Sequence, residues 1–305
     1  MKKVLIPTIC ILSILLILLN INQISDKIIN LLNYSYGNTL VTNNKYQNLN
    51  YEFVSNTNNI IPYGKQDILN LIYTILNNKI NNYTFYCPKE YKNCIQDIKD
   101  ISKDKNLLTH LNNFAHPYNS FSSIKTNITD YGEINLNINY IYTDSQITAI
   151  NNEVAKVINN LITKDIIEDY DKIKIIHDYI INNTKYDLKN NKQNNSYNAY
   201  GALFNHLATC NGYTDLMAIF LYELGYENYK IATTTETSGH VWNAVKINNE
   251  WLHLDLTWDD PVSKDNKDYL YHKYFLINNE ELKEADKNIT SKEHEFNPAI
   301  YTELK

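Results

Sequence analysis

The chain has no arginine, and its 305 residues include only seven glycines and four cysteines. The formal net charge is −6 and no lysine-rich block occurs, which argues against nucleic acid as a partner. The sequence also lacks an H-E-x-x-H motif, paired C-x-x-C motifs and a glycine-rich phosphate loop, so it predicts neither a metal centre nor a cofactor. Heavy use of Asn, Ile, Lys and Tyr accompanies the missing arginine and indicates an AT-rich genome, because the codons of those four residues are AT-rich.

The composition that remains is that of a globular protein. Hydrophobic residues make up 44% and charged residues 20% of the chain, which is enough apolar material for one large core or two modest ones. Segments with helical periodicity and segments with strict alternation both occur, and together they predict an α+β protein. The same patterns divide the chain into four parts, which are residues 1–22, 23–62, 63–143 and 144–300.

The first 22 residues predict a membrane anchor. Lys2 and Lys3 precede an almost unbroken apolar run from Val4 to Leu19, whose length is at the boundary between a signal-peptide core and a spanning helix. No A-x-A-like site follows the run, which favours an anchor that is not cleaved. With the two lysines held inside, we expect a single-pass membrane protein whose remaining residues lie outside the cytoplasm, or a secreted protein if the signal is cleaved.

A small α+β domain is expected over 63–143, after a polar linker at 23–62 that lacks clear periodicity. Its predicted elements are a helix at 65–76, a helix at 91–102 and a hairpin at 122–142 that turns at Tyr131 and Gly132.

Two cysteines of this domain raise the question of a disulfide. Cys87 and Cys94 are the only cysteines of the predicted exported part besides Cys210, and an oxidising location permits a bridge between them. The alternative is two separate buried thiols, because a strand end and the first turns of a helix need not approach within bridging range. Both possibilities stay open from the sequence.

From residue 144 the pattern becomes mainly helical. One helix is predicted over 145–162, and a second lies within 165–187. The second carries apolar residues on one face, at Ile166, Ile167, Tyr170, Ile173, Ile176 and Ile180. A third helix, apolar enough to be buried on most sides, is predicted from about Asn211 to Leu224, where Gly225 ends it.

Cys210 stands where this third helix begins. At that position the unpaired backbone N–H groups and the helix dipole stabilise a thiolate, and the same N–H groups provide part of an oxyanion hole. The alternative is a small residue tolerated at a helix entrance, which becomes the better interpretation if no base is available.

A base is predicted from a hairpin. Two alternating stretches, His240 to Ile247 and Glu250 to Thr257, flank Asn248 and Asn249, and a two-residue loop containing Asn favours a tight turn. Pairing Ile247 with Glu250 places His240 and Asp255 on one face as diagonal neighbours, close enough for the carboxylate to orient the imidazole.

Other candidates fit the role of base less well. His253 shares the face of Asp255 but is expected to be a packed or rim residue. His206 is a distant second candidate, because catalytic partners are usually far from the nucleophile in sequence. Asp259 and Asp260 precede Pro261, a combination typical of a turn.

Three motifs occur in order, namely T-C-N-G-Y at Thr209–Tyr213, G-H-V-W-N at Gly239–Asn243 and D-L-T-W-D-D-P at Asp255–Pro261. They resemble the C-x-G-Y, H-x-W-N and D-x-T-W-D-D-P motifs of bacterial members of the transglutaminase-like superfamily. The resemblance covers roughly 165–279 and implies a papain-like α+β core, with 144–300 as the catalytic domain.

The resemblance also assigns residues. It implies Cys210 as nucleophile, His240 as its base and Asp255 as the orienting carboxylate. Tyr200, Asn211 and Trp242 are candidates for contacts with the oxyanion or the substrate, and for Tyr200 simple packing is the alternative. The chain departs from many relatives by "HLATC" before the nucleophile and by the threonine after Gly-Tyr.

The expected function is that of an extracytoplasmic cysteine enzyme that acts on amide or peptide bonds through a thioester. Water would complete hydrolysis and an amine would complete acyl transfer, so a peptidase, an amidase and a cross-linking enzyme all remain possible. From the predicted location, cell-surface proteins or cell-wall peptides are the expected substrates. The alternative is a non-catalytic binding or assembly module at the cell surface, and an arylamine-type acyltransferase has less support because nothing suggests a coenzyme A site.

Overall fold

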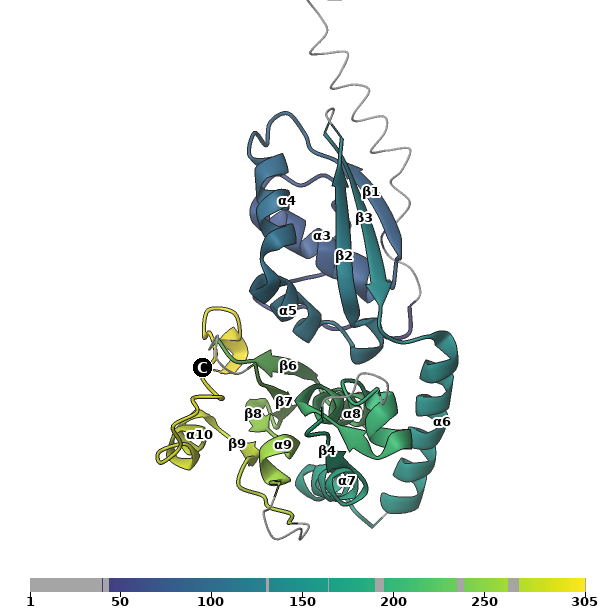
Figure 1. Cartoon of the computed structure of the whole chain (residues 1–305), viewed down its shortest axis with the longest axis vertical. Coiled ribbons are helices and arrows are strands. Elements are labelled where there is room, and N and C mark those ends of the chain that lie inside the picture. Colours follow the sequence, from purple (N-terminus) through teal and green to yellow (C-terminus); the bar gives the residue numbers. More distant parts are fainter. Residues whose placement is uncertain are drawn as a thin grey trace, which may run out of the picture.

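The computed structural model describes residues 40, 44–129, 132–163, 165–189, 195–234, 239–262 and 269–304. The predicted anchor at 1–22 and half of the predicted linker lie outside these residues. Within the described ranges, no helix has both the length and the apolar character needed to cross a membrane. An upper unit contains a three-stranded sheet, and a lower unit contains a four-stranded sheet (Figure 1).

The upper unit pairs helices with an antiparallel sheet of strand order β1-β3-β2. Its elements are α3 (Lys65–Asn77), β1 (Asn82–Tyr86), α4 (Cys94–Lys103), α5 (Lys105–Phe114), the 3₁₀ turn η1 (Pro117–Asn119), β2 (Phe121–Ile128) and β3 (Glu133–Tyr140). Burial alternates along β3, so Ile134, Leu136 and Ile138 join the helices in one core. The predicted helices and hairpin are present. The additional helix α5 begins where Asp104 accepts a hydrogen bond from the backbone N–H of Leu107.

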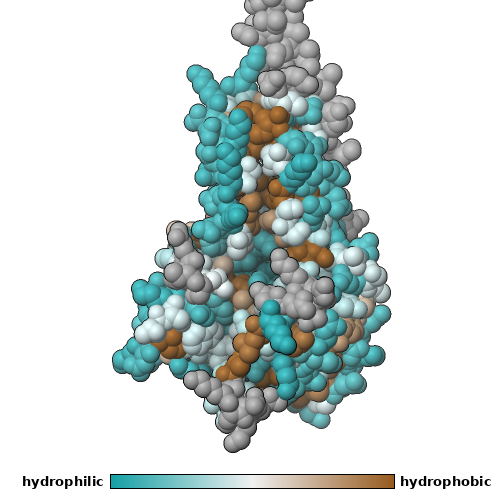
Figure 2. Space-filling model, in the orientation of Figure 1, coloured by the Kyte–Doolittle hydropathy of each residue, from teal (hydrophilic) through white to brown (hydrophobic). Residues whose placement is uncertain are grey.

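Apolar side chains also reach the surface of the upper unit, where they gather between its helices and β2 (Figure 2). The groove there is lined mainly by Ile68, Ile72, Phe85, Ile98, Ile101, Leu108, Ile124 and Leu136.

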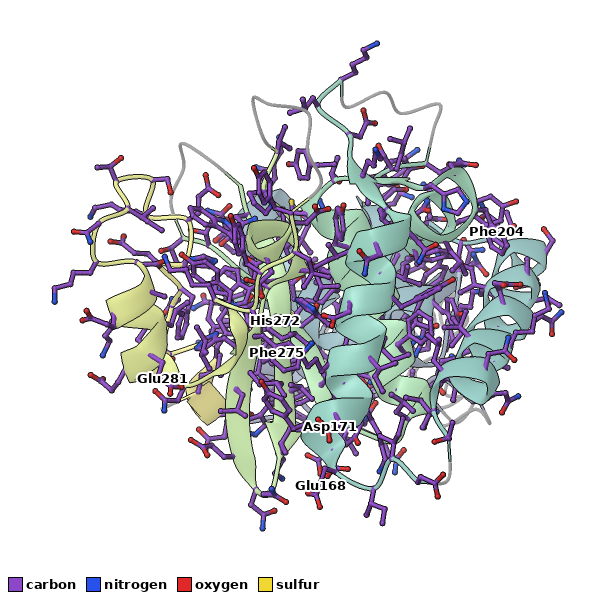
Figure 3. The ribbon with its side chains drawn as sticks, turned by 90° about the horizontal axis from the view of Figure 1, so that it is seen from below. Glu168, Asp171, Phe204, His272, Phe275 and Glu281 are labelled. Atoms are coloured by element: carbon purple, nitrogen blue, oxygen red, sulfur yellow. A yellow bond between two sulfur atoms is a disulfide. The ribbon has the colours of Figure 1, made fainter. Side chains whose placement is uncertain are left out.

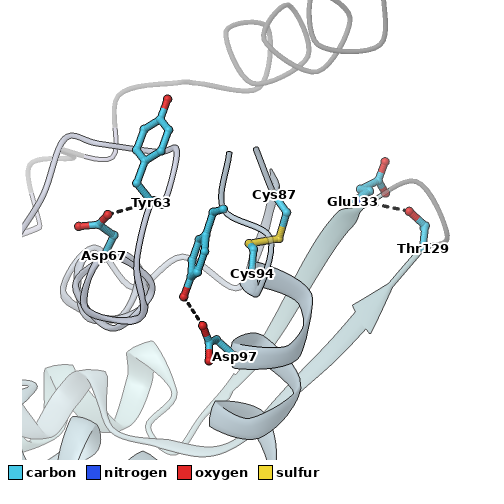
Figure 4. The surroundings of a disulfide bond; sticks show 8 residues. Tyr63, Asp67, Cys87, Cys94, Asp97, Thr129 and Glu133 are labelled. Carbon is cyan, nitrogen blue, oxygen red and sulfur yellow. Dashed lines mark hydrogen bonds between the residues drawn. A yellow bond between two sulfur atoms is a disulfide. The ribbon is translucent and has the colours of Figure 1, made fainter. Parts of the chain in front are cut away.

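Cys87 and Cys94 form a disulfide in the upper unit (Figure 4). Cys87 follows β1, Cys94 is the first residue of α4, and their Cα atoms are 5.8 Å apart. Backbone hydrogen bonds from Tyr91 N to Pro88 O and from Cys94 N to Tyr91 O fold the intervening segment back on itself. The strand end and the helix start therefore meet, and Cys210 is the free cysteine of the described part of the chain.

Residues 44–62 pack against both units, although the sequence predicts a linker here. Tyr51 and Val54 are buried in the core of the upper unit. The Tyr51 hydroxyl donates to the carbonyl of Asn228 in the lower unit, and the Tyr222 hydroxyl of that unit donates to the carbonyl of Lys45. This stretch is a packed strap rather than a free tether, while the predicted domain boundaries stay a prediction.

The lower unit consists of helices around an antiparallel sheet of order β6-β7-β8-β9, with a short parallel pair β4-β5 beside it. Its elements are α6 (Asp144–Leu161), α7 (Asp169–Asn183), β4 (Lys185–Tyr186), the π-helical turn η3 (Gly201–Asn205), β5 (Leu207–Ala208), α8 (Cys210–Glu223), β6 (Asn228–Ala232), β7 (Val241–Ile247), β8 (Glu250–Leu254), α9 (Leu256–Asp259), β9 (Phe275–Ile277), α10 (Asn279–Ala285) and the 3₁₀ turn η4 (Thr302–Leu304).

Helix α7 begins later than the apolar pattern predicts. Its first residue is Asp169, so Ile167 lies outside it and is 75% exposed, and Tyr170 is 51% exposed. The buried face starts at Ile173. The physical reason is that acidic residues are favoured in a first helical turn, and Asp169 and Asp171 occupy it.

Helix α8 is the central element of the lower unit. It packs on β6 and β7, and α7 lies beside it (Figure 1). It is buried almost throughout and begins at Cys210, one residue before the predicted start. Gly225 has φ +88°, a left-handed conformation that glycine adopts without strain, and the helix ends there as predicted.

Strands β7 and β8 pair in the predicted register, with Ile247 opposite Glu250. Asn248 and Asn249 have φ values of +49° and +67°, which is the backbone of the tight turn that two-residue hairpins prefer. The register fixes which residues meet at the open end of the hairpin. His240 directly precedes β7, and Asp255 directly follows β8.

The segment after α10 returns to the upper unit. Tyr301 is fully buried there, and its hydroxyl is hydrogen-bonded to His110, to Asn113 and to the backbone N–H of Ala232. Tyr301 and Leu304 belong to the core that contains α3 and α5. A second core lies between α7, α8 and the four-stranded sheet.

Candidate active site

Cys210 is the first residue of α8, and only 8% of it is exposed. The preceding Thr209 is extended, and its backbone N–H donates to the carbonyl of Ser196 at 2.7 Å. The first N–H groups of a helix have no partner within the helix. The thiol therefore lies where both a thiolate and a developing oxyanion are stabilised.

Gly212 allows the start of α8 to approach its neighbours. A Cβ at this position would lie 2.4 Å from the carbonyl oxygen of Ser196 and 2.9 Å from the Cβ of Ala208. The backbone atom among these contacts cannot move without moving its loop. The glycine of the Cys-Asn-Gly-Tyr motif is thus required by close packing beside the thiol.

His240 and Asp255 meet at the open end of the hairpin. The distance from His240 Nε2 to Asp255 Oδ2 is 2.5 Å, and the two residues are 6% and 2% exposed. This contact leaves Nδ1 of the imidazole for Cys210, whose side chain is within hydrogen-bond reach of His240. The structure therefore brings together the three residues that the sequence predicts as a triad.

The electrostatics of this group favour charged side chains. Burial alone would lower the pKa of His240, but the charge and hydrogen bond of Asp255 outweigh it, and the pKa rises to about 10. Burial alone would raise the pKa of Asp255, but its interactions with His240 and His294 hold that pKa well below its usual range. An imidazolium–carboxylate pair is thus the favoured state at neutral pH.

Asp255 also caps α9. Its Oδ1 accepts hydrogen bonds from the backbone N–H groups of Thr257 at 2.8 Å and Trp258 at 3.2 Å. A carboxylate in this role satisfies helix N–H groups that have no other partner. The cap holds the side chain in one orientation, which directs Oδ2 towards His240.

His294 is a site residue that the sequence does not predict. Its Nε2 lies 2.9 Å from the same Oδ2 of Asp255, and its Nδ1 lies 3.0 and 3.1 Å from the two oxygens of Asp286. The residue is 4% exposed. It belongs to an irregular segment after α10 in which no periodicity indicates a partner, so no signal in one sequence could have placed it here.

Three weaker predictions have different outcomes. Trp242 is 1% exposed, stacks on His240 with ring centroids 5.7 Å apart and donates its indole N–H to His253. Its ring therefore lies against the imidazole, and the expected contact with substrate or oxyanion stays a prediction. Tyr200 is half-buried with its ring 4.7 Å from that of Phe204, which is the packing alternative. Asn211 is exposed in the first turn of α8, where its proposed role stays a prediction.

Tyr186 of β4 is an aromatic residue near the nucleophile that the sequence does not single out. Burial raises its pKa, and the charges of Cys210 and Glu293 act in the same direction. The parallel pairing of Tyr186 with Ala208 brings it next to Cys210, and such pairing has no local sequence signal. A pocket of about 240 Å³ opens beside Tyr186, lined also by Leu188, Thr257, Trp258, Asp260, Pro261, Val262 and Glu293.

Asp259 is not a turn residue, and that prediction is wrong. It is the last residue of α9 and is fully buried. Its Oδ1 accepts hydrogen bonds from the backbone N–H groups of Lys273 at 2.8 Å and Tyr274 at 3.0 Å. The side chain thus connects α9 to the segment leading into β9. Buried backbone N–H groups need a hydrogen-bond acceptor, and Asp259 provides it.

His177 approaches Asp259 from α7. Its Nε2 lies 3.3 Å from Asp259 Oδ2, and its Nδ1 lies 2.9 Å from Asp178 Oδ1. His272 also contacts Asp178, at 2.6 Å, and Figure 3 shows His272 and Phe275 beside α7. His177 is therefore packed in a network between α7 and the segment before β9.

Two groups of His and Asp in the described part of the chain have donor atoms close enough to share a cation. One is His177, Asp178 and His272, and the other is His240, Asp255 and His294. In both, the imidazoles are already hydrogen-bonded to the carboxylate, and Lys174 also pairs with Asp178 at 2.6 Å. Neither group is assigned as a metal site, and the expectation of no metal stays a prediction.

A thiol at the start of a buried helix, facing a histidine on an antiparallel sheet, defines a papain-like core. Residues 156–256 match the family described as the transglutaminase-like superfamily. The matched segment runs from α6 to the first residue of α9, and it contains Cys210, His240 and Asp255. No curated protein matches the chain.

Two solved structures are similar to parts of the chain. One is a TGase with 16% sequence identity and a TM-score of 0.33, and the similarity covers 45% of each chain. The other is a proposed cysteine protease from Cytophaga hutchinsonii with 12% identity and a TM-score of 0.30, covering 48% of this chain and 65% of that one. The chain spans less than two thirds of either structure, and similarities of this size do not bear on the activity.

Proposed function

We propose that the chain is a cysteine enzyme that acts on amide or peptide bonds, with Cys210 as nucleophile, His240 as acid and base, and Asp255 as the orienting carboxylate. One observation carries the proposal. Cys210 begins a buried helix within reach of an imidazole whose Nε2 is held 2.5 Å from a buried carboxylate. A non-catalytic module would have no need of this combination.

The mechanism follows from these positions. The sulfur of Cys210 attacks the carbonyl carbon of an amide, and N–H groups at the start of α8 stabilise the negative oxygen of the tetrahedral intermediate. As the C–N bond breaks, the imidazolium of His240 gives its proton to the leaving amine, and a thioester remains. His240 then takes a proton from water or from a second amine while the oxygen or nitrogen of that molecule attacks the thioester carbon. The C–S bond breaks, the thiolate of Cys210 is regenerated beside the imidazolium, and the product is an acid or a new amide.

The surroundings of Cys210 favour a peptide-like substrate. The pocket beside Tyr186 is open and combines aromatic and aliphatic walls with two carboxylates, Asp260 and Glu293. At its mouth Leu188 is 73% and Val262 is 55% exposed, which leaves apolar surface for a substrate side chain. Protein or peptide substrates are therefore proposed, and the choice between hydrolysis and acyl transfer is left to experiment.

Location outside the cytoplasm is also a proposal, and it is based on the apolar run after Lys2 and Lys3. The Cys87–Cys94 bridge supports it, because disulfides persist mainly in oxidising compartments. In fractionated cells the protein should sediment with membranes, and protease added to intact cells should degrade its folded part. Recovery of the full-length protein in the soluble fraction would contradict the anchor, and resistance to added protease would contradict its orientation.

The test of activity uses the thiol itself. Iodoacetamide at mildly acidic pH should alkylate Cys210 in the wild type, because a thiolate paired with an imidazolium persists there, whereas an ordinary thiol hardly reacts. The matched control is His240→Ala, which keeps the thiol and removes its partner. Equal, slow alkylation of both proteins would support a non-catalytic module instead.

The substrate can then be identified by capturing the thioester. Extract of the producing cells is mixed with the wild-type protein, the reaction is quenched in acid, and the acyl group on Cys210 is identified by mass spectrometry. Cys210→Ser is a useful partner in this experiment, because its ester would survive conditions that hydrolyse a thioester.

A further inference from the structure

We propose that His294 is a positioning residue for the reaction, which shares the carboxylate of Asp255 with His240 and so limits how strongly that carboxylate holds the catalytic imidazolium. The inference rests on the proposed function of Cys210, His240 and Asp255. It adds His294, which lies outside the matched segment 156–256, to the residues that act in the proposed reaction.

The geometry shows one oxygen divided between two imidazoles. Asp255 Oδ2 lies 2.5 Å from Nε2 of His240 and 2.9 Å from Nε2 of His294. The two rings are nearly perpendicular, with centroids 5.5 Å apart. The other oxygen of Asp255 is occupied by the N–H groups that begin α9. Neither histidine can move along the carboxylate without displacing the other or breaking the cap.

His294 is held as a cation. Its Nδ1 faces both oxygens of Asp286 and its Nε2 faces Asp255, and an imidazole donates from both nitrogens only when it is protonated. Burial would lower the pKa of His294, but the hydrogen bonds and charges of these two carboxylates raise it overall. The Tyr274 hydroxyl donates to Asp286 at 2.9 Å and so holds the carboxylate of Asp286 in place.

Other groups around His294 do not replace these partners. His253 is kept neutral, because burial lowers its pKa to about 4. Burial alone would raise the pKa of Asp286, but its hydrogen bond and charge interaction with His294 outweigh burial and lower that pKa, and the charge of Lys273 acts in the same direction. Lys283, Lys292 and Glu295 line a pocket of about 700 Å³ that also reaches His294, and the carboxylate of the neighbouring Glu293 accepts a hydrogen bond from the indole of Trp258. This pocket gives His294 a route for exchanging its proton with solvent.

The sign of the charge therefore alternates along a row of neighbouring side chains. The row runs from the thiolate of Cys210 through His240, Asp255 and His294 to Asp286. A cation behind Asp255 weakens the attraction between Asp255 and the imidazolium of His240. Without it, His240 would hold its proton to higher pH and would be a poorer acid towards the leaving amine. Asp255 would also lose one of the two side-chain contacts on Oδ2.

The experiment follows alkylation of Cys210 by iodoacetamide across pH, which needs no substrate. The profile has an inflection at high pH where His240 loses its proton. In His294→Asn we expect this inflection to move up by about one pH unit, because two charges at this separation interact appreciably even in a partly screened interior. Asp286→Asn should move this inflection in the same direction by a smaller amount, because His294 then loses its proton more easily.

The matched control is His253→Gln, which removes another buried histidine of the same sheet that makes no hydrogen bond to Asp255. It should lower the thermal midpoint while the inflection of His240 stays in place. Once a substrate is known, His294→Asn should lower kcat more than it changes KM, and His294→Gln should recover part of the loss. Circular dichroism verifies the fold of each variant.

The outcomes separate the two proposals. A wild type with a reactive thiolate and an unshifted His294→Asn profile would overturn the role of His294 and leave the proposed function standing. A folded Asp286→Asn with an unshifted profile would do the same if His294→Asn did not fold. A wild type that reacts as an ordinary thiol would overturn the proposed function, and the role of His294 would fall with it.

Discussion

His240 and Asp255 are 15 residues apart in sequence, and their side chains meet with Nε2 2.5 Å from Oδ2. Replacing Asp255 by Asn keeps an oxygen for the cap of α9 but presents an amide to two imidazoles that need an acceptor. His240 then loses the carboxylate that stabilises its imidazolium and fixes its tautomer.

We therefore expect Asp255→Asn to lower kcat by at least about tenfold and to change KM little. The corresponding change in serine triads lowers the rate by up to about 10⁴-fold. Steady-state kinetics on a peptide amide measure both. A loss expressed mainly in KM would mean that Asp255 acts on substrate binding instead of the imidazole.

Cys210→Ala should abolish turnover and leave the fold intact. The side chain is small and stands at the entrance of α8, so its removal costs little packing, while no other free cysteine lies in the described part of the chain. Activity and circular dichroism are measured together. Turnover at the wild-type rate would show that another residue is the nucleophile.

The His240–Asp255 pair predicts how stability depends on pH. The pKa of His240 rises from 6.5 to about 10 on folding, so its contribution is fully present below pH 6.5 and is lost as pH rises towards 10. The pKa of Asp255 falls from 3.8, so its contribution is present above that pH and is lost in acid.

The free energy of unfolding of the wild type should therefore decrease between about pH 6.5 and 10. Asp255→Asn should show a flatter decrease over the same range, because His240 loses the charge that raises its pKa. Urea unfolding at several pH values gives the two curves, and parallel curves would contradict the coupling.

Gly212→Ala should destabilise the protein by about 1–3 kcal/mol, because the new methyl group has no room beside the start of α8. The clash with the carbonyl of Ser196, at 2.4 Å from an ideal Cβ, should also displace the thiol and reduce activity. Gly64→Ala is the matched control, since no atom lies within 4 Å of its Cβ position. Thermal unfolding of the two variants should differ clearly.

Asp259→Asn should affect stability more than chemistry. One oxygen accepts two buried N–H groups, from Lys273 and Tyr274, and the other approaches His177. We expect a loss of about 1–3 kcal/mol from the imperfect replacement and a change in kcat of less than about threefold per folded molecule. A large kcat effect with unchanged stability would place Asp259 in the chemistry.

The part of the site carried by local patterns could be predicted from the sequence. Two adjacent asparagines set the hairpin turn, the turn set the register, and the register placed His240 near Asp255. Cys210 at a helix start followed from the apolar run and from Gly225. These are short-range features, in which a residue type determines the backbone within a few positions.

The parts that could not be predicted depend on distant contacts. His294 reaches Asp255 from 39 residues further along the chain, through an irregular segment. Tyr186 comes to Cys210 through a two-residue parallel strand pair. Asp259 suggested a turn because Asp and Pro favour turns, but burial under the segment before β9 made it an anchor.

The segment that carries both His294 and Tyr301 sets an order of events during synthesis. Strands, α8 and the thiol of Cys210 are all encoded before it, so they can form in a nascent chain that lacks it. Only when residues 286–304 have emerged can His294 reach Asp255 and Tyr301 enter the upper core. In a prematurely terminated fragment, the carboxylate of Asp255 would therefore contact His240 alone.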